Sequence, residues 1–270
     1  MTHSRVRTRE LLTSRALAPR RDLGQNFVVD PNTVRRIAHL ARVGPDDHVV
    51  EVGAGLGALT LALADQGAEV LAIEVDAGLA AALGDVVGGR PNVRIVRADA
   101  LTVDWAELLA AAPTWALVAN LPYNVATPLV ADLLDTVPAI TRMLVMVQRE
   151  VGERLATAPG SGAYGAVSVK VAYWAAARVV GAVPASVFMP QPNVESVLVE
   201  ITRRPPPVVD AERMFSLVRT AFGQRRKMLR RSLRERVTPE QFAAAGVVLT
   251  DRPEDVGLDG WVRLANAIGP

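Results

Sequence analysis

The sequence predicts an α/β fold, in which a doubly wound, mostly parallel sheet is followed by a small C-terminal helical domain. In the first half of the chain, apolar runs of strand length alternate with helical segments over short loops. Continuous apolar strands of this kind are typical of sheets that helices cover on both faces. The stiff run Arg204-Pro205-Pro206-Pro207 then precedes segments that show only helical patterns.

Most of the predicted sheet comes from the first half of the chain. Asp30 followed by Pro31 is a typical helix start, and this first helix is expected to run to Ala41. The predicted strands cover residues 48–52, 70–74, 93–98, 115–119 and 143–148. The predicted connecting helices cover residues 58–66, 79–87 and 128–135, and glycines follow the first two of them.

The second half changes from this alternation to a mainly helical pattern. Between residues 163 and 204 we expect one helix and two strands, at 178–183 and 196–202. Helices are then predicted over residues 211–222, 225–234, 239–245 and 258–267. The expected organisation is a basic N-terminal arm at 1–22, a ligand-binding α/β domain at 23–204 and a helical domain at 208–270.

Composition excludes several classes of protein. Of the 270 residues 50% are hydrophobic, but no apolar run approaches the roughly 18 residues that a membrane-spanning helix needs. The absence of cysteine excludes disulfides and thiolate metal sites, and it suits a reducing compartment such as the cytoplasm. His3, His39 and His48 are scattered along the chain, so no metal site is expected.

Basic residues form two clusters, although the net charge is only +2. One cluster lies in the N-terminal arm and the other near the C-terminus, so together they flank the α/β part. Such clusters are typical of proteins that contact nucleic-acid phosphates, although solvated helix faces give the same composition. The residues expected to contact the nucleic acid are Arg20, Arg21, Arg225, Arg226, Lys227, Arg230 and Arg231.

A glycine-rich loop and a later acid predict a site for a nucleoside. Gly53, Gly55 and Gly57 lie between a predicted strand and a predicted helix. Glu74 ends the next strand about twenty residues later, where an acid can accept hydrogen bonds from both ribose hydroxyls. The alternative is a surface acid at a strand end. The spacing Gly-x-Gly-x-Gly departs from the dinucleotide fingerprint.

Two ligands compete for this site, S-adenosylmethionine and a dinucleotide. A dinucleotide needs its pyrophosphate at a helix N-terminus, whereas S-adenosylmethionine has no phosphate and carries a sulfonium cation. Asp99 can accept a hydrogen bond from the adenine amine of the cofactor, and Asn26 can close over its methionine end. Neither residue has a role in a simple dehydrogenase, so we expect S-adenosylmethionine.

The run Asn120-Leu121-Pro122-Tyr123 ends a buried strand in a tight turn. An adenine amine is a poor nucleophile because its lone pair is delocalised into the ring. If the Asn120 side-chain oxygen and the Leu121 carbonyl accept its two hydrogens, the nitrogen can become tetrahedral and attack a sulfonium methyl. Pro122 fixes the turn, and Tyr123 offers a ring on which the base can stack. The alternative is a structural turn with a core tyrosine.

Phe188 is the candidate for the opposite face of the base. It lies in the proline-stiffened run Phe188-Met189-Pro190-Gln191-Pro192, and the alternative is a core phenylalanine at a strand start. A base inside a duplex cannot reach such a pocket, so the target is expected to be unpaired or flipped out.

Taken together, these motifs resemble the bacterial small-subunit rRNA adenine N6,N6-dimethyltransferase family along nearly the whole chain. The shared segments are Leu23-Gly24-Gln25-Asn26-Phe27, residues 51–60, Asn120-Leu121-Pro122-Tyr123-Asn124 and residues 188–196. Erythromycin-resistance rRNA methyltransferases share these four segments. Residues 162–169 and 222–233 are similar to the small-subunit enzymes in particular.

The resemblance implies a Rossmann-like class I methyltransferase domain and a C-terminal domain that binds RNA. It implies S-adenosylmethionine contacts, which together with the glycine loop comprise Asn26, Val28, Gly53, Gly55, Glu74, Asp99 and Asn120. The implied reaction is methylation of N6 on two adjacent adenines, in a hairpin near the 3′ end of 16S rRNA within an immature small ribosomal subunit. We expect a cytoplasmic monomer. The alternatives are a resistance-type 23S rRNA methyltransferase and a chiefly non-catalytic assembly factor.

Overall fold

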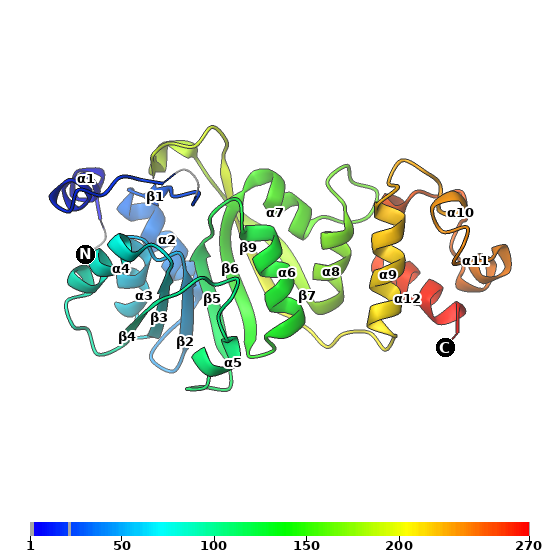
Figure 1. Ribbon diagram of the computed structural model, residues 1–270, viewed down its shortest axis with the longest axis horizontal. Helices are drawn as coiled ribbons and strands as arrows, with labels where there is room; N and C mark the ends of the chain where they lie inside the picture. The colour runs from blue at the N-terminus through cyan, green and yellow to red at the C-terminus, as the bar shows by residue number, and fades with distance from the viewer. Residues whose placement is uncertain (1–2, 21–22, 270) are drawn as a thin grey trace. The chain divides into compact units, whose positions relative to one another are not determined.

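The computed structural model describes residues 3–20 and 23–269 and divides the chain into two compact units (Figure 1). One, which we call the sheet unit, comprises Met1–Gly152 and Val179–Arg203. The other, the helical unit, comprises Glu153–Arg178 and Arg204–Pro270. The three segments expected from the sequence, at 1–22, 23–204 and 208–270, and the function expected of each remain predictions.

A seven-stranded sheet in the described part of the chain confirms the predicted doubly wound, mostly parallel fold. Its strand order is β4-β3-β2-β5-β6-β9-β7. β2 pairs in parallel with β3 and β5, β3 pairs with β4, and β5 pairs with β6, whereas β9 is antiparallel to β6. The strands are β2 (His48–Val52), β3 (Glu69–Glu74), β4 (Val93–Arg97), β5 (Trp115–Asn120), β6 (Ile140–Gln148), β7 (Ala175–Val183) and β9 (Ser196–Arg203).

Helices precede and connect these strands, as Figure 1 shows. They are α1 (Arg5–Ser14), α2 (Pro31–Ala41), α3 (Ala58–Ala64), α4 (Ala77–Val87), α5 (Trp105–Leu108), α6 (Ala126–Thr136) and α7 (Arg149–Ala156). Aspartates begin three of them: Asp30 accepts a hydrogen bond from the Thr33 amide, Asp76 accepts one from the Leu79 amide, and Asp104 accepts from the amides of Ala106 and Glu107. The second cap explains why α4 begins earlier than the sequence pattern suggested.

The core of the sheet unit lies around its central strands. Val49, Val50 and Leu117 have no exposed surface, and Val34 and Ile37 of α2 belong with Val49 to one buried apolar cluster. Side chains of successive strand residues point to opposite faces, so strands buried along their length need cover on both sides. That requirement is the physical origin of the continuous apolar runs in the sequence.

A short second sheet joins two segments that are far apart in the sequence. β1 (Phe27–Val28) pairs antiparallel with β8 (Phe188–Met189), and the Val29 amide donates to the Val187 carbonyl at 2.8 Å. A single-turn 3₁₀ helix, η1 (Ala185–Val187), precedes β8. Neither strand was predicted, because two residues carry no periodic signal. This pairing holds the segment that contains Asn26 in place.

The helical unit has its own core, formed around Tyr164, Met214, Phe242 and Trp261. Its elements are α8 (Ala166–Trp174), α9 (Ala211–Phe222), α10 (Leu229–Ser232), α11 (Pro239–Ala245), the 3₁₀ helix η2 (Pro253–Asp255) and α12 (Leu258–Ala267). None of the helices that the structure describes, in either unit, combines the length and the apolar character that crossing a lipid bilayer requires.

The helix predicted over residues 225–234 is wrong in its extent, because α10 comprises only Leu229–Ser232. The amides of Leu229 and Arg230 donate to the carbonyls of Asp251 and Leu249 at 2.8 and 2.9 Å. These amides therefore bond across to a neighbouring loop rather than to carbonyls one turn earlier. A tertiary contact of this kind overrides local helix propensity.

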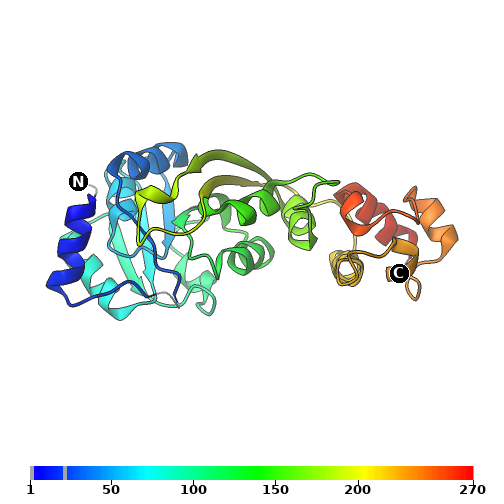
Figure 2. The same cartoon turned by 90° about the horizontal axis from the view of Figure 1, so that it is seen from above.

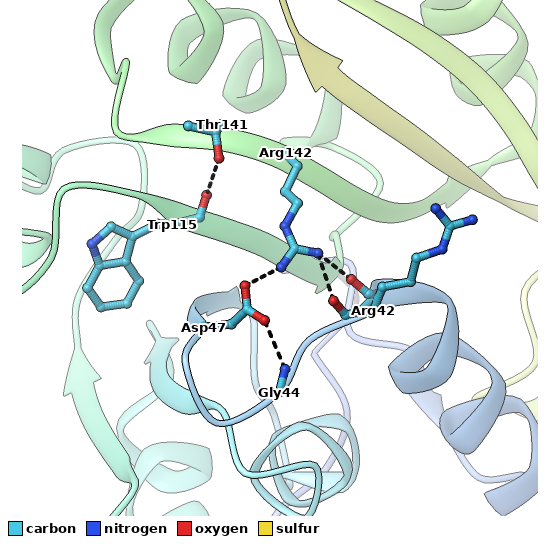
Figure 3. Close-up of polar contacts among 7 residues, drawn as sticks. Arg42, Gly44, Asp47, Trp115, Thr141 and Arg142 are labelled. Carbon is cyan, nitrogen blue, oxygen red and sulfur yellow. Dashed lines mark hydrogen bonds and ion pairs between the residues drawn. The ribbon is translucent and has the colours of Figure 1, made fainter.

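Arg142 of β6 forms hydrogen bonds that hold the turn between α2 and β2 against the sheet (Figure 3). Arg142 lies near the start of β6, so this contact is at the end of the sheet opposite the carboxyl ends of the strands. Its guanidinium donates to the carbonyls of Ala41 and Arg42 at 2.6 and 3.2 Å and pairs with the Asp47 carboxylate. The other Asp47 oxygen accepts from the Gly44 amide at 2.9 Å. Arg42 ends α2 in the left-handed conformation, so Arg142 satisfies carbonyls that the helix leaves open.

We expect Arg142→Ala to lower the free energy of unfolding by about 1–3 kcal/mol, because it removes a charged donor from the Ala41 and Arg42 carbonyls and from the Asp47 carboxylate. Arg142→Lys should recover only part of this loss, since an ammonium cannot reproduce the planar fork. Urea unfolding measures the stability of both variants. Arg94→Ala, at an exposed position of β4, is the control. Equal stability of Arg142→Ala and the control would contradict the assignment.

Candidate functional site

The candidate site lies where the sheet order reverses. From β2 the chain crosses to β3, whereas β5, the neighbour of β2 on the other side, continues to β6. Loops that follow β2 and β5 therefore diverge and leave a crevice at the carboxyl ends of the strands. The cavity found there is lined by residues of both loops, including Gly53, Gly55 and Asn120.

The glycine loop is held by the acid that the sequence singled out. The Gly55 amide donates to Glu74 Oε2 at 2.8 Å, and the Asp76 amide donates to Oε1 at 3.0 Å. Gly55 has a φ of +57°, and a Cβ there would lie 3.1 Å from the Phe27 ring. Glycine is therefore required both for the backbone conformation and for the close approach of the segment that carries Asn26.

Among the described residues, two carboxyl groups line this cavity, those of Glu51 and Glu74. Burial raises the pKa of Glu51 to about 8, against the effect of a hydrogen bond from the Thr60 hydroxyl and with a further contribution from the charge of Glu74. That hydrogen bond measures 2.5 Å. Burial also raises the pKa of Glu74, although amides that donate to it oppose the shift. Glu51 is thus mainly neutral at pH 7.

The orientation of the Asn120 side chain follows from its partner. Its Nδ2 donates to the Asn26 carbonyl at 2.9 Å. A carbonyl can only accept, so the amide nitrogen must face Asn26 and the amide oxygen is left as an acceptor. The following residue is fixed as well, because the Leu121 amide donates to the Met146 carbonyl of β6 at 3.1 Å.

The two aromatic candidates are placed differently. Tyr123 lines the cavity, and its hydroxyl lies 3.1 Å from the Ser196 hydroxyl. Burial raises the pKa of Tyr123, so its ring carries a neutral phenol. Phe188 has no exposed surface and packs in the apolar cluster that contains Val34. Its ring is not open to a base in this arrangement, and its stacking role stays a prediction.

Most of the predicted cofactor residues come together. Asn26, Val28, Gly53, Gly55, Glu74 and Asn120 all line the cavity. Asp99 is exposed just beyond β4, and its Oδ1 accepts a hydrogen bond from the Leu101 amide at 2.9 Å. It is not among the residues found to line the cavity. Gly24 has a φ of +63°, and a Cβ there would approach the Asn124 Oδ1 to 3.2 Å.

The predicted nucleic-acid contacts fall into two groups. Arg20 lies 3.8 Å from Asp76, and Arg21 lies outside the described residues. In the helical unit, Arg225 pairs with Glu254 at 3.4 Å and donates to the Gly162 carbonyl at 2.9 Å. Arg225 thus also holds its own unit together. The exposed residues of this group are Arg226, Lys227, Arg230 and Arg231.

Three polar residues among those found to line the cavity were not predicted as site residues: His3, Thr8 and Glu51. Glu51 lies two residues before Gly53, and an acid among the valines of this strand was a signal that could have found it. His3 and Thr8 had no such signal, because α1 was not predicted. They reach the cavity through tertiary packing alone.

The lining fits the predicted cofactor. It supplies carboxyl, amide and hydroxyl oxygens, and its described residues include neither lysine nor arginine. A pyrophosphate would meet Glu51 and Glu74 with no lysine or arginine from these residues, whereas a sulfonium donor carries a positive charge. The donor set therefore favours S-adenosylmethionine over a dinucleotide.

Glu51 makes the stability of the protein depend on pH. Its pKa is about 8 in the folded chain against 4.5 as the ordinary value, so the folded state holds a proton that the unfolded chain releases. Stability should therefore fall as pH rises from about 4.5 to 8, by at most about 1.4 kcal/mol per pH unit from this group.

We expect Glu51→Gln to fall less steeply in stability than the parent protein across this range. Thermal unfolding at pH 5 and pH 8, without donor, measures the difference. Glu107→Gln, an exposed change on α5, is the matched control. A parent-like pH dependence in Glu51→Gln would show that Glu51 titrates near its ordinary value.

Known proteins resemble this chain over nearly its full length. Residues 17–268 match the model of the ribosomal RNA adenine dimethylase family. The ribosomal RNA small subunit methyltransferase A of Thermobifida fusca is 48% identical over 269 residues, which covers 95% of this chain and 93% of the relative. The protein of the same name from Moorella thermoacetica is 42% identical, over 97% of this chain and 96% of its own length.

Two solved structures share the fold. The 23S rRNA methyltransferase ErmE superposes with a TM-score of 0.70 at 28% identity, covering 90% of this chain and all of that chain. A dimethyladenosine transferase from Plasmodium falciparum gives a TM-score of 0.72 at 21% identity, covering 87% of this chain and 94% of its own. The second likeness is one of fold alone.

Proposed function

This chain belongs to the ribosomal RNA adenine dimethylase family, and from that premise we propose that its substrate is 16S rRNA within an immature small ribosomal subunit. Membership of the family confirms the resemblance found in the sequence. The protein is an S-adenosylmethionine-dependent rRNA adenine methyltransferase. The proposed targets are N6 of two adjacent adenines in a hairpin near the 3′ end.

The orientation of Asn120 is the observation that supports adenine N6 as the target. Its amide oxygen is left as an acceptor by the hydrogen bond from Nδ2 to Asn26. An N6 amine has two hydrogens, and the second is assigned to the Leu121 carbonyl in the same turn. Accepting both lets the nitrogen become tetrahedral, so its lone pair leaves the ring and can attack a methyl carbon.

The other residues of the site serve this geometry. When bound, S-adenosylmethionine supplies a methyl group on a positively charged sulfur. Glu74 is placed to accept the ribose hydroxyls, and Asn26 and Val28 line the same cavity from the opposite segment. Tyr123 offers its ring to the target base. We assign Phe188 to the other face of the base and Asp99 to the cofactor adenine, although the first is buried and the second exposed here.

Small-subunit RNA is favoured over large-subunit RNA by the degree of likeness. The small-subunit enzymes of T. fusca and M. thermoacetica are 48% and 42% identical to this chain, against 28% for the 23S enzyme ErmE. We therefore place the 23S reaction second. An assembly factor without catalysis is less well supported, because the cavity brings the cofactor residues together.

Exposed basic residues of the helical unit are the proposed contacts with rRNA phosphates. They are Arg226, Lys227, Arg230 and Arg231. We propose Arg20 and Arg21, near the N-terminus of the chain, as further contacts. Arg225 belongs to the same proposal, but its contacts with Glu254 and Gly162 mean that its substitution would also disturb the fold. We propose that the protein acts as a monomer in the cytoplasm, where ribosomal subunits mature in bacteria.

Mapping of methylated adenines by mass spectrometry tests the proposed function. The purified protein, incubated with S-adenosylmethionine and small subunits that lack these methyl groups, should add four methyl groups, two on each of two adjacent adenines of 16S rRNA. Mature small subunits and large subunits are the controls. Methylation confined to 23S rRNA would support the resistance-type alternative, and tight subunit binding without any methylation would support the assembly factor.

A further inference from the structure

The N-terminal helix α1 lies against the cofactor-binding edge of the sheet unit. Leu11 and Leu12 of α1 are buried in an apolar cluster with Leu56 of the glycine loop and Leu79 of α4. Figures 1 and 2 show α1 beside α4. The family match begins at residue 17, so α1 precedes the part of the chain that the family model describes. The family pattern therefore gives no role to α1.

Polar contacts attach α1 at both of its ends. Near its start, the Arg5 guanidinium donates to the carbonyls of Ser186 and Phe188 at 2.7 and 3.2 Å. Just after its end, Arg15 pairs with Asp85 of α4. Two arginines of the predicted basic arm are thus engaged within the protein. The RNA-facing role of that arm stays a prediction.

The chain is also shaped for this docking. A Cβ on Gly78 of α4 would lie 2.5 Å from the end of the Leu17 side chain, so a larger residue there would make Leu17 shift. Gly78 lies in the first turn of α4, two residues after the capping Asp76. The space beside Gly78 is thus occupied by Leu17, which follows α1 and packs against the apolar cluster that contains Leu11 and Leu12.

His3 connects this helix to the cavity. It lines the cavity together with Thr8 of α1, and only 6% of its surface is exposed. Its Nδ1 is buried and has no hydrogen-bond partner among the described residues. Burial lowers the pKa of His3 to about 4, with a further contribution from the charge of Arg7. A buried ring nitrogen without a partner costs free energy unless a ligand supplies one.

We propose that α1 is a lid over the cofactor cavity and that His3 Nδ1 forms a hydrogen bond with the bound S-adenosylmethionine. This inference rests on the proposed function, because it takes the occupant of the cavity to be that cofactor. The neutral imidazole can pair with a hydroxyl or amine of the ligand without placing a second positive charge beside a sulfonium. Cofactor exchange requires α1 to leave its place on Leu56 and Leu79.

Locking α1 in place tests the lid. The chain has no cysteine, so Arg15→Cys with Asp85→Cys introduces the only two thiols. A short bis-thiosulfonate reagent links them and a reductant releases them. We expect the link to slow release of radiolabelled S-adenosylhomocysteine at least tenfold, with recovery on reduction. Asp65→Cys with Arg90→Cys, linked the same way, is the matched control, because that ion pair measures 2.6 Å and does not involve α1.

Substitution of His3 tests the contact. His3→Ala should weaken S-adenosylmethionine binding about tenfold in calorimetry, and His3→Gln, which keeps an acceptor, should recover part of this loss. His39→Ala, on the exposed side of α2, is the control. Unchanged affinity in His3→Ala overturns the contact, and equal release rates from the two linked proteins overturn the lid. If the parent protein binds no cofactor at all, the proposed function fails together with this inference.

Discussion

The hydrogen bond from the Asn120 amide to the Asn26 carbonyl is the interaction on which the site depends. It joins the end of β5 to the segment around Asn26, which lies before the first strand of the seven-stranded sheet in the sequence. By holding the amide nitrogen, it leaves the amide oxygen pointing away from its partner, and an acceptor at a fixed place is what an adenine amine requires. Preorganisation of this kind lowers the barrier because no group must reorient during the reaction.

Close backbone approach makes that hydrogen bond possible. The segment around Asn26 passes close to the glycine loop at Gly55, and its own Gly24 lies against the turn at residues 122–124; both glycines have positive φ angles. Pairing of β1 with β8 fixes the far side of the same segment. The cavity is thus formed by elements from three regions of the chain, held by short-range contacts at the sheet edge.

Periodicity and motif spacing predicted the elements that carry strong local signals. The strands β2 to β6 appear as apolar runs in the sequence. The capping residue Asp30 predicts the start of the helix at Pro31–Ala41. Glu74 was recognisable because its distance from the glycine loop is set by one strand–helix–strand unit. Motif order along the chain likewise assigned Asn26, Gly53 and Asn120 to one site, and all three line the cavity.

What remained hidden depends on tertiary contacts. The amides of Leu229 and Arg230 donate to carbonyls of a loop about twenty residues later in the chain, so the observed helix there is shorter than the predicted one. In the sequence, Arg142 is only a polar residue within an apolar strand. Its role in holding the turn at Asp47 becomes visible only in the folded structure (Figure 3). The place of α1 over the cavity follows from Leu11 and Leu12 packing on α4, and helical arginine-rich segments give no sign of what they cover.

The isosteric variant Asn120→Asp tests the central claim most directly. An aspartate keeps the shape and an oxygen acceptor, but it cannot donate to the Asn26 carbonyl, so the carboxylate should turn away from its place. We expect the single-turnover rate of methyl transfer, at saturating S-adenosylmethionine, to fall at least about 100-fold, as on loss of one preorganised group. A rate within a few-fold of the parent protein would show that the Asn26 hydrogen bond does not position the catalytic oxygen.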